Sequence, residues 1–487
     1  MRRLHMENPQ KTNLLKKNSV TFWGALAVSA AFMGPAVSIF FNMPPAAKAA
    51  GAAFPLSFLI SLIAILFIAN SVIQFSKKVN GAGFAFTFAS HGVGPKTGFM
   101  AGWTLLLAYA MISPITYAGF GEMLSEFLER QFDVHVSWIP FFILIAIVVS
   151  VLSMFGVNHS TITTIIFLVL ELAIVLAAIV SVFIGGTEPS LAPFNPANAS
   201  GGFSSVGLAM VFGILSFTGF EAAANLGEEV KDARRTVPRA IILSVIMIGI
   251  FYVLGAYVVS IFFNDPAAVA NNDAPFDTIA RSLWGDKFAW IITLTALNSV
   301  FANAVAGQTS VVRNIFSLGR EGILPRSLGK TNSKGAPVNA IVFDLILSAV
   351  LGLGVGLWKD GWAVWGLLGS IMALGLIVVY GIVTFALPRY YLKQHRSEFS
   401  PWKHLIFPII GMLLLLLPLY SSLYPVPDFP NNLAPYILIA WIIGGYLYLS
   451  GIKRRNPEVV DSFGSVFRED SHSGGGSLPL VGQESLK

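Results

Sequence analysis

Runs of about 20 apolar residues recur along this chain, and they restrict it to folds that span a lipid bilayer. We predict twelve such spans, all of helical length: 20–43, 54–75, 97–121, 138–156, 161–184, 204–226, 240–263, 288–310, 338–357, 362–387, 405–424 and 433–451. Only 11% of the 487 residues are charged, whereas a soluble domain carries about 25%. The alternating ten-residue strands typical of a membrane barrel are not the pattern here. The predicted fold class is therefore an all-α integral membrane protein.

Two of the predicted spans are interrupted by residues that a lipid-facing helix avoids. The first span carries Gly34 followed by Pro35, and the sixth carries Ser216, Gly219 and Glu221 close together. Irregular backbone at membrane depth is tolerated only where it faces protein or a water-filled cavity. Paired interruptions in the two halves of a membrane protein indicate a transporter's substrate site. The alternative for the first span is a simple kink in a packed helix.

A helix break of this kind can bind charged groups of a substrate through backbone atoms alone. The half-helix that starts after a break points free N–H groups toward an anion, such as a substrate carboxylate. The carbonyls that end the preceding half-helix face a cation or an ammonium group. A zwitterion would fit between the two without any charged side chain.

The distribution of Lys and Arg predicts the orientation of the chain. With a cytoplasmic N-terminus, the outer side receives only five of the 31 Lys and Arg residues. These five are Lys48, Arg130, Arg281, Lys287 and Lys359. By the positive-inside rule both termini are cytoplasmic, and we expect the plasma membrane. The formal charge of +6 then belongs to the inner membrane face and does not indicate a nucleic-acid partner.

The sequence also argues against several kinds of chemistry. It contains no cysteine, which excludes disulfides, thiolate metal sites and cysteine nucleophiles. The histidines lie in tails, loops or helix ends without metalloprotease-like spacing, so we expect no metal, no cofactor and no enzyme activity. We expect no cleaved signal peptide, because the basic stretch at 1–19 leads into a full-length span.

Three acidic residues lie inside predicted spans, where an ionised carboxylate is costly and is usually functional or internally paired. Glu221 follows the break directly; it could bind a substrate amine, carry a proton, or cap freed backbone N–H groups. Glu171 sits mid-span; it either bonds a backbone carbonyl as a protonated acid or takes part in proton coupling or a cation site. Asp344 lies near the inner end of its span, and we expect it to be structural.

Polar stripes run along two further spans. Tyr109, Ser113 and Thr116 share one face of the third span, and Thr295, Asn298 and Ser299 share a face of the eighth. Either stripe could line a cavity or hold helices together. Trp362 and Trp365 open the tenth span as either interfacial anchors or a gate.

Several motifs resemble a known transporter family. Ser216-Phe-Thr-Gly-Phe-Glu221 and Glu228-Glu-Val-Lys-Asp-Ala-Arg-Arg-Thr-Val-Pro-Arg239 are similar to paired motifs of the amino acid–polyamine–organocation (APC) superfamily, and Arg313-Asn-Ile-Phe-Ser-Leu-Gly-Arg-Glu-Gly-Ile-Leu-Pro325 is similar to the motif after its eighth span. The resemblance covers roughly residues 18–455.

This resemblance implies a LeuT-type fold with 5+5 inverted repeats and discontinuous helices 1 and 6. The implied divisions are a cytoplasmic tail (1–19), a first repeat (20–184), a second repeat (204–387), two extra helices (402–455) and a disordered cytoplasmic tail (456–487). We expect a permease that moves amino acids by alternating access, as a proton symporter or an exchanger. A transporter of ethanolamine or polyamines and a non-transporting sensor remain alternatives. The oligomeric state is left open.

The resemblance also implies which residues bind the substrate. The first break would hold the carboxylate, the sixth span the amine, and the third span would line the site; the residues are Gly34, Ala36, Val37, Tyr109, Ser113, Leu215, Ser216, Phe217 and Thr218. Either Leu215 or Phe217 takes the position of the family's aromatic lid. Glu221 and Glu171 are the candidates for proton coupling or amine binding.

Two departures from the family pattern bear on the substrate. Pro35 replaces a small residue of the first break, and proline has no N–H to give to a carboxylate. Glu171 stands at or near the place where some relatives have a lysine that substitutes for sodium. The proline keeps ethanolamine-like or polyamine substrates open, whereas Glu171 could bind a proton, a cation or a neighbouring backbone group.

Overall fold

The computed structural model describes residues 20–79, 84–155, 161–227, 229–272, 274–332 and 335–455. Over these ranges the chain is helical, and its β-type contacts are limited to two isolated bridges. The predicted tails at 1–19 and 456–487 lie outside the described residues.

Ten stretches of helix in the described part of the chain are long and apolar enough to cross a membrane, so this is a multi-pass membrane protein. They are α1 with α2 (Phe22–Met33, Pro35–Phe41), α4 (Phe54–Ser76), α6 with α7 (Pro95–Ala110, Ile112–Phe132), α9 (Thr161–Ile184), α12 (Ala233–Phe263), α15 (Asp286–Arg320), α16 (Val338–Trp358), α17 (Gly361–Gln394), α18 (Phe407–Ser421) with the turn before it (Trp402–Ile406), and α19 (Ala434–Arg455).

Two shorter apolar helices lie where the fourth and sixth spans are predicted. They are α8 (Trp138–Met154) and α10 (Gly202–Ser216). The remaining described α-helices are short connecting pieces: α3 (Met43–Ala50), α5 (Phe84–Gly92), α11 (Ala222–Asn225), α13 (Pro266–Ala270) and α14 (Pro275–Trp284).

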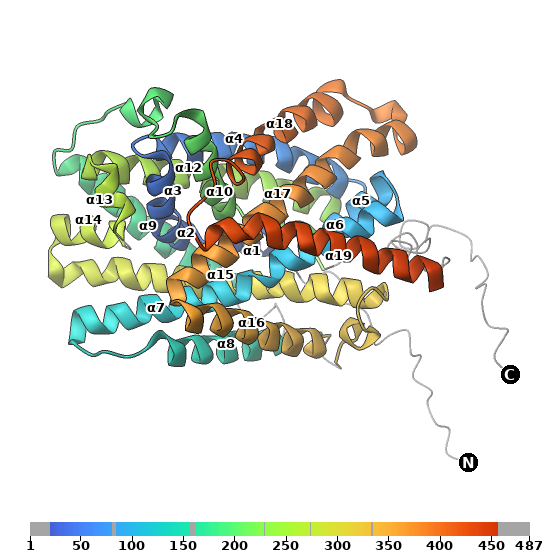
Figure 1. Ribbon diagram of the computed structural model, residues 1–487, viewed down its shortest axis with the longest axis horizontal. Helices are drawn as coiled ribbons and strands as arrows, with labels where there is room; N and C mark the ends of the chain where they lie inside the picture. Colours follow the sequence, from blue (N-terminus) through green and yellow to red (C-terminus); the bar gives the residue numbers. More distant parts are fainter. Residues whose placement is uncertain are drawn as a thin grey trace, which may run out of the picture.

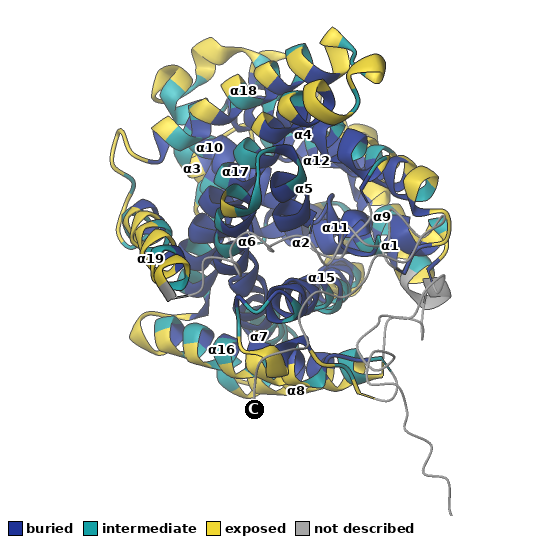
Figure 2. Cartoon of the chain, turned by 90° about the vertical axis from the view of Figure 1, so that its right-hand side faces the viewer, coloured by how far each residue is buried: buried dark blue, intermediate teal, exposed yellow. Residues whose placement is uncertain are grey.

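The bundle has two sides with a buried centre between them. Helices α7, α8, α15 and α16 lie on one side, and α4, α10, α12 and α18 lie on the other (Figure 1). Helices α1, α2 and α11 lie between these groups (Figure 2). Figure 2 also shows that exposed residues gather on the outward faces of the peripheral helices. Those faces carry large apolar side chains such as Leu144 and Ile147 of α8, as lipid contact requires.

The first helix is interrupted at Gly34, where the sequence predicts a break. Gly34 has a left-handed conformation with φ of +57°, and Pro35 then starts α2 at the position where its missing N–H is harmless. A Cβ atom at Gly34 would overlap the side chains of Val37 and Asn303. Glycine is therefore required here by both backbone conformation and space.

The second interruption follows α10. Helix α10 ends at Ser216, residues 217–221 form turns, and α11 begins at Ala222. Gly219 has φ of +105°, and a Cβ atom there would overlap the ring of Phe32 in α1. Each break thus fits closely against other central helices, and the two breaks lie near each other.

We predict that Gly34→Ala destabilises the protein by about 1–3 kcal/mol or more, since it combines a strained φ with overlap of two neighbours. Thermal unfolding in detergent, followed by size-exclusion chromatography of the remaining folded protein, measures the effect. Gly354→Ala in α16 is the matched control: no atom lies within 4 Å of its Cβ position and its φ is not positive, so its stability should stay the same or rise. Equal stability of the two variants would contradict the strain argument.

Candidate functional site

One tyrosine joins the two helix breaks. The Tyr252 hydroxyl of α12 lies 2.6 Å from the Met33 carbonyl oxygen and 2.9 Å from the Ser216 carbonyl oxygen. Met33 and Ser216 are the last residues of α1 and α10, so both carbonyls have lost their helical partners. A single hydroxyl hydrogen is shared between them at the centre of the bundle.

A serine of α1 makes a second bridge to the segment after α10. The Ser29 hydroxyl donates to the Phe220 carbonyl at 3.2 Å and accepts from the Ala223 amide at 3.0 Å. The side chain is fully buried. The broken parts of the two helices are therefore held to each other directly.

The amides released by the first break are all paired within the protein. The Gly34 amide donates to Ala31 and the Ser38 amide to the Gly34 carbonyl. The Ala36 amide donates to Glu171 Oε1 at 2.7 Å. The Val37 amide donates to Ser299 Oγ at 3.1 Å, and that hydroxyl donates onward to Glu171 Oε1 at 2.6 Å. Glu171 of α9, 2% exposed, thus caps the start of α2.

Glu221 is surrounded by hydrogen-bond donors at the second break. Its Oε1 accepts from the Tyr109 hydroxyl at 2.7 Å, and its Oε2 accepts from the Tyr380 hydroxyl at 3.1 Å and the Gly219 amide at 3.2 Å. Asn225 in turn donates to the Tyr109 hydroxyl at 3.2 Å. The carboxylate therefore ties the turn after α10 to α6 and α17, and it caps a backbone N–H that the break sets free.

A small cavity of about 20 Å³ lies between the two breaks. Residues from both breaks and from α7, α15 and α17 line it: Phe32, Met33, Val37, Ser38, Asn42, Ile112, Ile115, Leu215, Thr218, Asn303, Trp365 and Met372. None of these residues carries a formal charge. The cavity is mostly apolar with a few convergent polar groups, which is typical of a small-molecule site.

Two buried oxygens on the cavity wall lack a hydrogen-bond partner. They are Oγ1 of Thr218 and Oδ1 of Asn303. The Asn303 amide nitrogen donates to the Phe32 carbonyl, and a carbonyl can only accept. The orientation of the Asn303 amide is therefore fixed by chemistry, and its free oxygen remains as an acceptor.

An aromatic cluster lies at one side of this cavity and includes Trp365 of its lining. Phe41 contacts Trp362 and Trp365 edge-on, with ring centres 4.9 and 4.6 Å apart. Trp365 also donates to Asn42 Oδ1 at 3.2 Å. Of the two tryptophans that open α17, Trp365 lines this cavity, and Trp362 packs behind it against Phe41.

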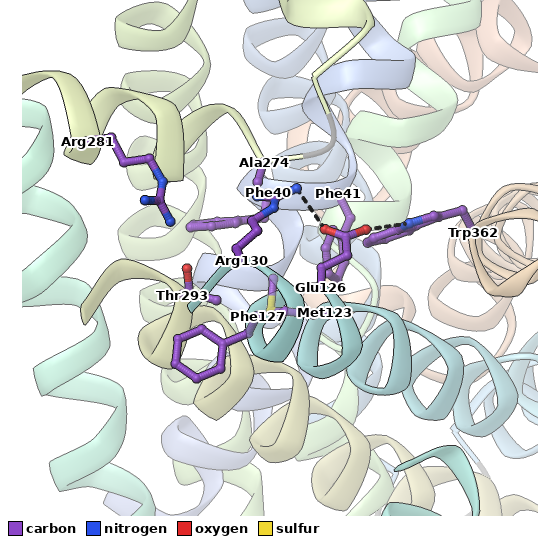
Figure 3. Close-up of a pocket in the computed structure, with 10 residues that line it drawn as sticks. All are labelled: Phe40, Phe41, Met123, Glu126, Phe127, Arg130, Ala274, Arg281, Thr293 and Trp362. Carbon is purple, nitrogen blue, oxygen red and sulfur yellow. Dashed lines mark hydrogen bonds and ion pairs between the residues drawn. The ribbon is translucent and has the colours of Figure 1, made fainter. Parts of the chain in front are cut away.

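A second small cavity, of about 20 Å³, lies beyond this aromatic cluster (Figure 3). Phe41 and Trp362 contribute to its wall, together with Glu126, Arg130 and Arg281. Glu126 joins two helices there, because it accepts from Arg130 at 3.1 Å and from the Trp362 indole at 3.0 Å. The second cavity is thus charged, in contrast to the first.

A paired contact closes the opposite end of the bundle. Val20, before α1, exchanges backbone hydrogen bonds of 3.0 Å with Glu229 and Lys231. The Glu229 carboxylate receives two hydrogen bonds from the Arg313 guanidinium of α15, at 2.7 and 3.0 Å, and both side chains are 7% exposed. This ion pair fastens the start of α1 and the segment after α11 to α15.

The structure brings part of the predicted set of site residues to the first cavity. Val37, Leu215 and Thr218 line it, whereas Gly34, Ala36 and Ser216 lie in the adjoining breaks. Of the two lid candidates, Leu215 lines the cavity, whereas Phe217 packs edge-on against Tyr252 with ring centres 5.3 Å apart.

The polar stripe of the third span does not line this cavity. Tyr109 bonds Glu221, and Ser113 donates to Asp344 Oδ2 at 2.9 Å. Gln308 of α15 also donates to Asp344 and to hydroxyls of α7 and α8. This fully buried network holds α7, α8, α15 and α16 together, so that here the stripe joins helices.

Sequence reasoning missed several residues of the site. Asn303 follows Ser299 by one helical turn, so the stripe of the eighth span extended by four residues would have indicated it. Ser38 and Asn42 repeat at the same spacing along the first span. Tyr252 had no such signal. No cluster of metal-ligating side chains occurs among the residues that the structure describes.

Comparison with known proteins agrees with this geometry. A family model described as "Amino acid permease" matches residues 29–458. The chain belongs to the amino acid permease family. This family consists of transporters and not of enzymes.

Relatives of this permease act on chemically different solutes. The low-affinity putrescine importer PlaP of Escherichia coli K12 is 26% identical over 436 residues, which is 84% of this chain and 89% of that protein. The branched-chain amino acid permease BcaP of Lactococcus lactis is 26% identical over 392 residues, 76% and 81% of the two chains. The aromatic amino acid transport protein AroP of E. coli O157:H7 is 24% identical, with 74% and 80% covered. Both amines and amino acids thus occur among relatives at similar distance.

We predict that Tyr252→Phe in this permease weakens folding by about 1–3 kcal/mol, because it leaves the buried Ser216 carbonyl without its donor and the Met33 carbonyl with Ser38 alone. Thermal unfolding of the purified variant measures the loss. Tyr436→Phe on α19, which removes an exposed hydroxyl, serves as the control. A Tyr252→Phe variant as stable as this control would show that the breaks do not depend on the shared hydrogen bond.

Proposed function

We propose that this permease is a secondary active transporter that moves amino acids or small amines across the plasma membrane by alternating access. The observation that carries the proposal is the cavity between two interrupted helices. An aromatic cluster (Phe41, Trp362 and Trp365) lies on one side of it, and the Glu229–Arg313 pair lies toward the opposite end of the bundle. A central site with a separate set of contacts toward each side can be opened to each side in turn.

The proposal includes the finer topology. Twelve spans form two inverted repeats (20–184 and 204–387) followed by two extra helices (402–455), with both termini in the cytoplasm. The distribution of Lys and Arg supports this orientation. The aromatic cluster then faces outward, and the Glu229–Arg313 pair faces the cytoplasm.

Transport is driven either by a proton gradient or by exchange, with Glu171 and Glu221 as the candidate proton carriers. Each carboxylate lies at a helix break and is fully or almost fully buried. A buried carboxylate that joins separate helices can couple its protonation to their rearrangement.

Uptake into proteoliposomes tests the proposal. A panel of radiolabelled amino acids and amines is offered with and without a pH gradient, and also with unlabelled solute inside to detect exchange. We expect accumulation or exchange of at least one solute. Specific binding without movement of any bound solute would instead indicate a sensor.

We predict that Glu221→Gln lowers the uptake rate or flattens its dependence on pH. Glutamine keeps the size of the side chain but cannot release a proton, and its NH₂ group meets the Tyr380 hydroxyl and the Gly219 amide as a second donor. Initial uptake rates from acidic to mildly alkaline pH provide the measurement. If uptake equals that of the unmodified protein across this pH range, Glu221 has only a structural role as a cap of the helix break.

We predict that Arg313→Gln opens the cytoplasmic side of the cavity, since breaking a buried ion pair costs about 3–5 kcal/mol. The chain has no cysteine, so Thr218→Cys supplies a unique label position on the cavity wall. Arg313→Gln should raise the labelling rate of that cysteine by a membrane-impermeant thiol reagent applied from the cytoplasmic side. Lys48→Gln, which breaks an exposed pair with Asp428, is the control and should leave labelling unchanged. Equal rates in both variants would contradict a gating role for Arg313.

A further inference from the structure

The position that a substrate carboxylate would take at the first break is filled by a side chain of the protein itself. Every residue from Gly34 to Ser38 either pairs its N–H group within the protein or, at Pro35, has none. The Ala36 amide reaches Glu171 directly, and the Val37 amide reaches it through the Ser299 hydroxyl. A carboxylate brought in by a substrate would find no amide here to bind.

The charge of Glu171 opposes a second carboxylate at the same place. Its hydrogen-bond donors, the Ala36 amide and the Ser299 hydroxyl, are neutral dipoles, and the carboxylate is buried where charges are weakly screened. Two carboxylates in such surroundings cannot both stay ionised without a strong penalty. Glu171 therefore excludes a substrate carboxylate by charge as well as by the donors it uses.

The cavity wall favours a ligand that donates hydrogen bonds. The free Asn303 Oδ1 can only accept, and the Thr218 hydroxyl oxygen can accept. The Ser38 hydroxyl already donates to the Met33 carbonyl at 2.8 Å, so that its lone pairs remain for a donor. A protonated amine supplies up to three N–H donors and no acceptor.

Glu171 also supplies the charge that a cationic ligand needs. The cavity lining contains no acidic side chain, and an unbalanced cation in a buried site is costly. Val37 lines the cavity, and its own amide is joined to Glu171 through Ser299. The carboxylate therefore lies directly behind the wall that faces the ligand.

We infer that the substrate of this permease is a protonated alkylamine without a carboxylate group, and that Glu171 is the residue that sets this preference. The inference rests on the proposed function and narrows it to one substrate class. Glu171 acts on the ligand through its charge and by keeping the Ala36 and Val37 amides engaged.

Matched pairs of solutes that differ only in a carboxylate provide the test. Suitable pairs are 1,4-diaminobutane with ornithine, 3-methylbutylamine with leucine, and 2-phenylethylamine with phenylalanine. Uptake into proteoliposomes and thermal stabilisation of the purified protein are measured for both members of each pair. We expect that, in the pair whose side chain fits, the amine binds more tightly than the amino acid by on the order of 100-fold.

Substitutions at Glu171 separate its two effects. Glu171→Gln keeps an oxygen that accepts from Ala36 and Ser299 but loses the charge, so amine affinity should fall without a gain for the amino acid. Glu171→Ala also frees the two amides, so the preference should shift toward the amino acid of the pair. Glu188→Gln, an exposed residue beyond the end of α9, is the matched control and should keep the original preference.

The possible outcomes distinguish this inference from the proposed function. An amino acid that binds the unmodified protein as well as its decarboxylated partner, or better, overturns the inference and leaves the transporter intact. Amines that stabilise the protein but do not move overturn transport and leave the inference intact. If no member of any pair binds or moves, both fail. If Glu171→Ala does not fold, an unchanged preference of Glu171→Gln with unchanged amine affinity still overturns the role of Glu171.

Discussion

The structure depends on satisfying backbone groups that two helix breaks release inside a membrane protein. Hydrocarbon offers no hydrogen bonds, so each freed carbonyl and amide has to find a partner within the bundle. Tyr252 serves the carbonyls that end α1 and α10, Glu171 and Ser299 serve the amides that begin α2, and Glu221 serves the Gly219 amide. The central polar side chains thus serve first as hydrogen-bond partners of freed backbone groups, and the ligand can use only the polar atoms that remain.

The partners come from helices that are distant in sequence, and this has a mechanical consequence. Ala36 and Glu171 are 135 residues apart, and Tyr109 and Glu221 are 112 residues apart. Any movement that opens the cavity has to break or carry along these bonds. In contrast, the network around Asp344 joins α7, α8, α15 and α16 away from the breaks. These four helices are therefore tied to one another by side-chain hydrogen bonds, and α15 also bonds the first break through Ser299 and Asn303.

The sequence predicted the elements of this fold better than their contacts. Apolar runs and the Gly34 and Gly219 positions can be read locally, because span length and backbone conformation depend on neighbouring residues. The fourth and sixth spans, however, appear as shorter helices in the described chain. The partner of a buried polar residue depends on packing between helices. For this reason Ser113, which shares a stripe with Tyr109, lies against Asp344 and not at the cavity.

For Glu171, the sequence and the structure lead to different conclusions about the role of the side chain. In the sequence it is a lone acid in an apolar helix, and its role could be assigned to a proton, a cation or a backbone carbonyl. In the structure its carboxylate accepts a hydrogen bond from the Ala36 amide at the helix break. It therefore occupies a backbone N–H group that could otherwise bind an anionic ligand. Pro35 acts in the same direction, because it removes another donor from the same turn. The missing N–H of Pro35 and the carboxylate of Glu171 both disfavour a substrate carboxylate at this break, which is what the proposed preference for an alkylamine requires.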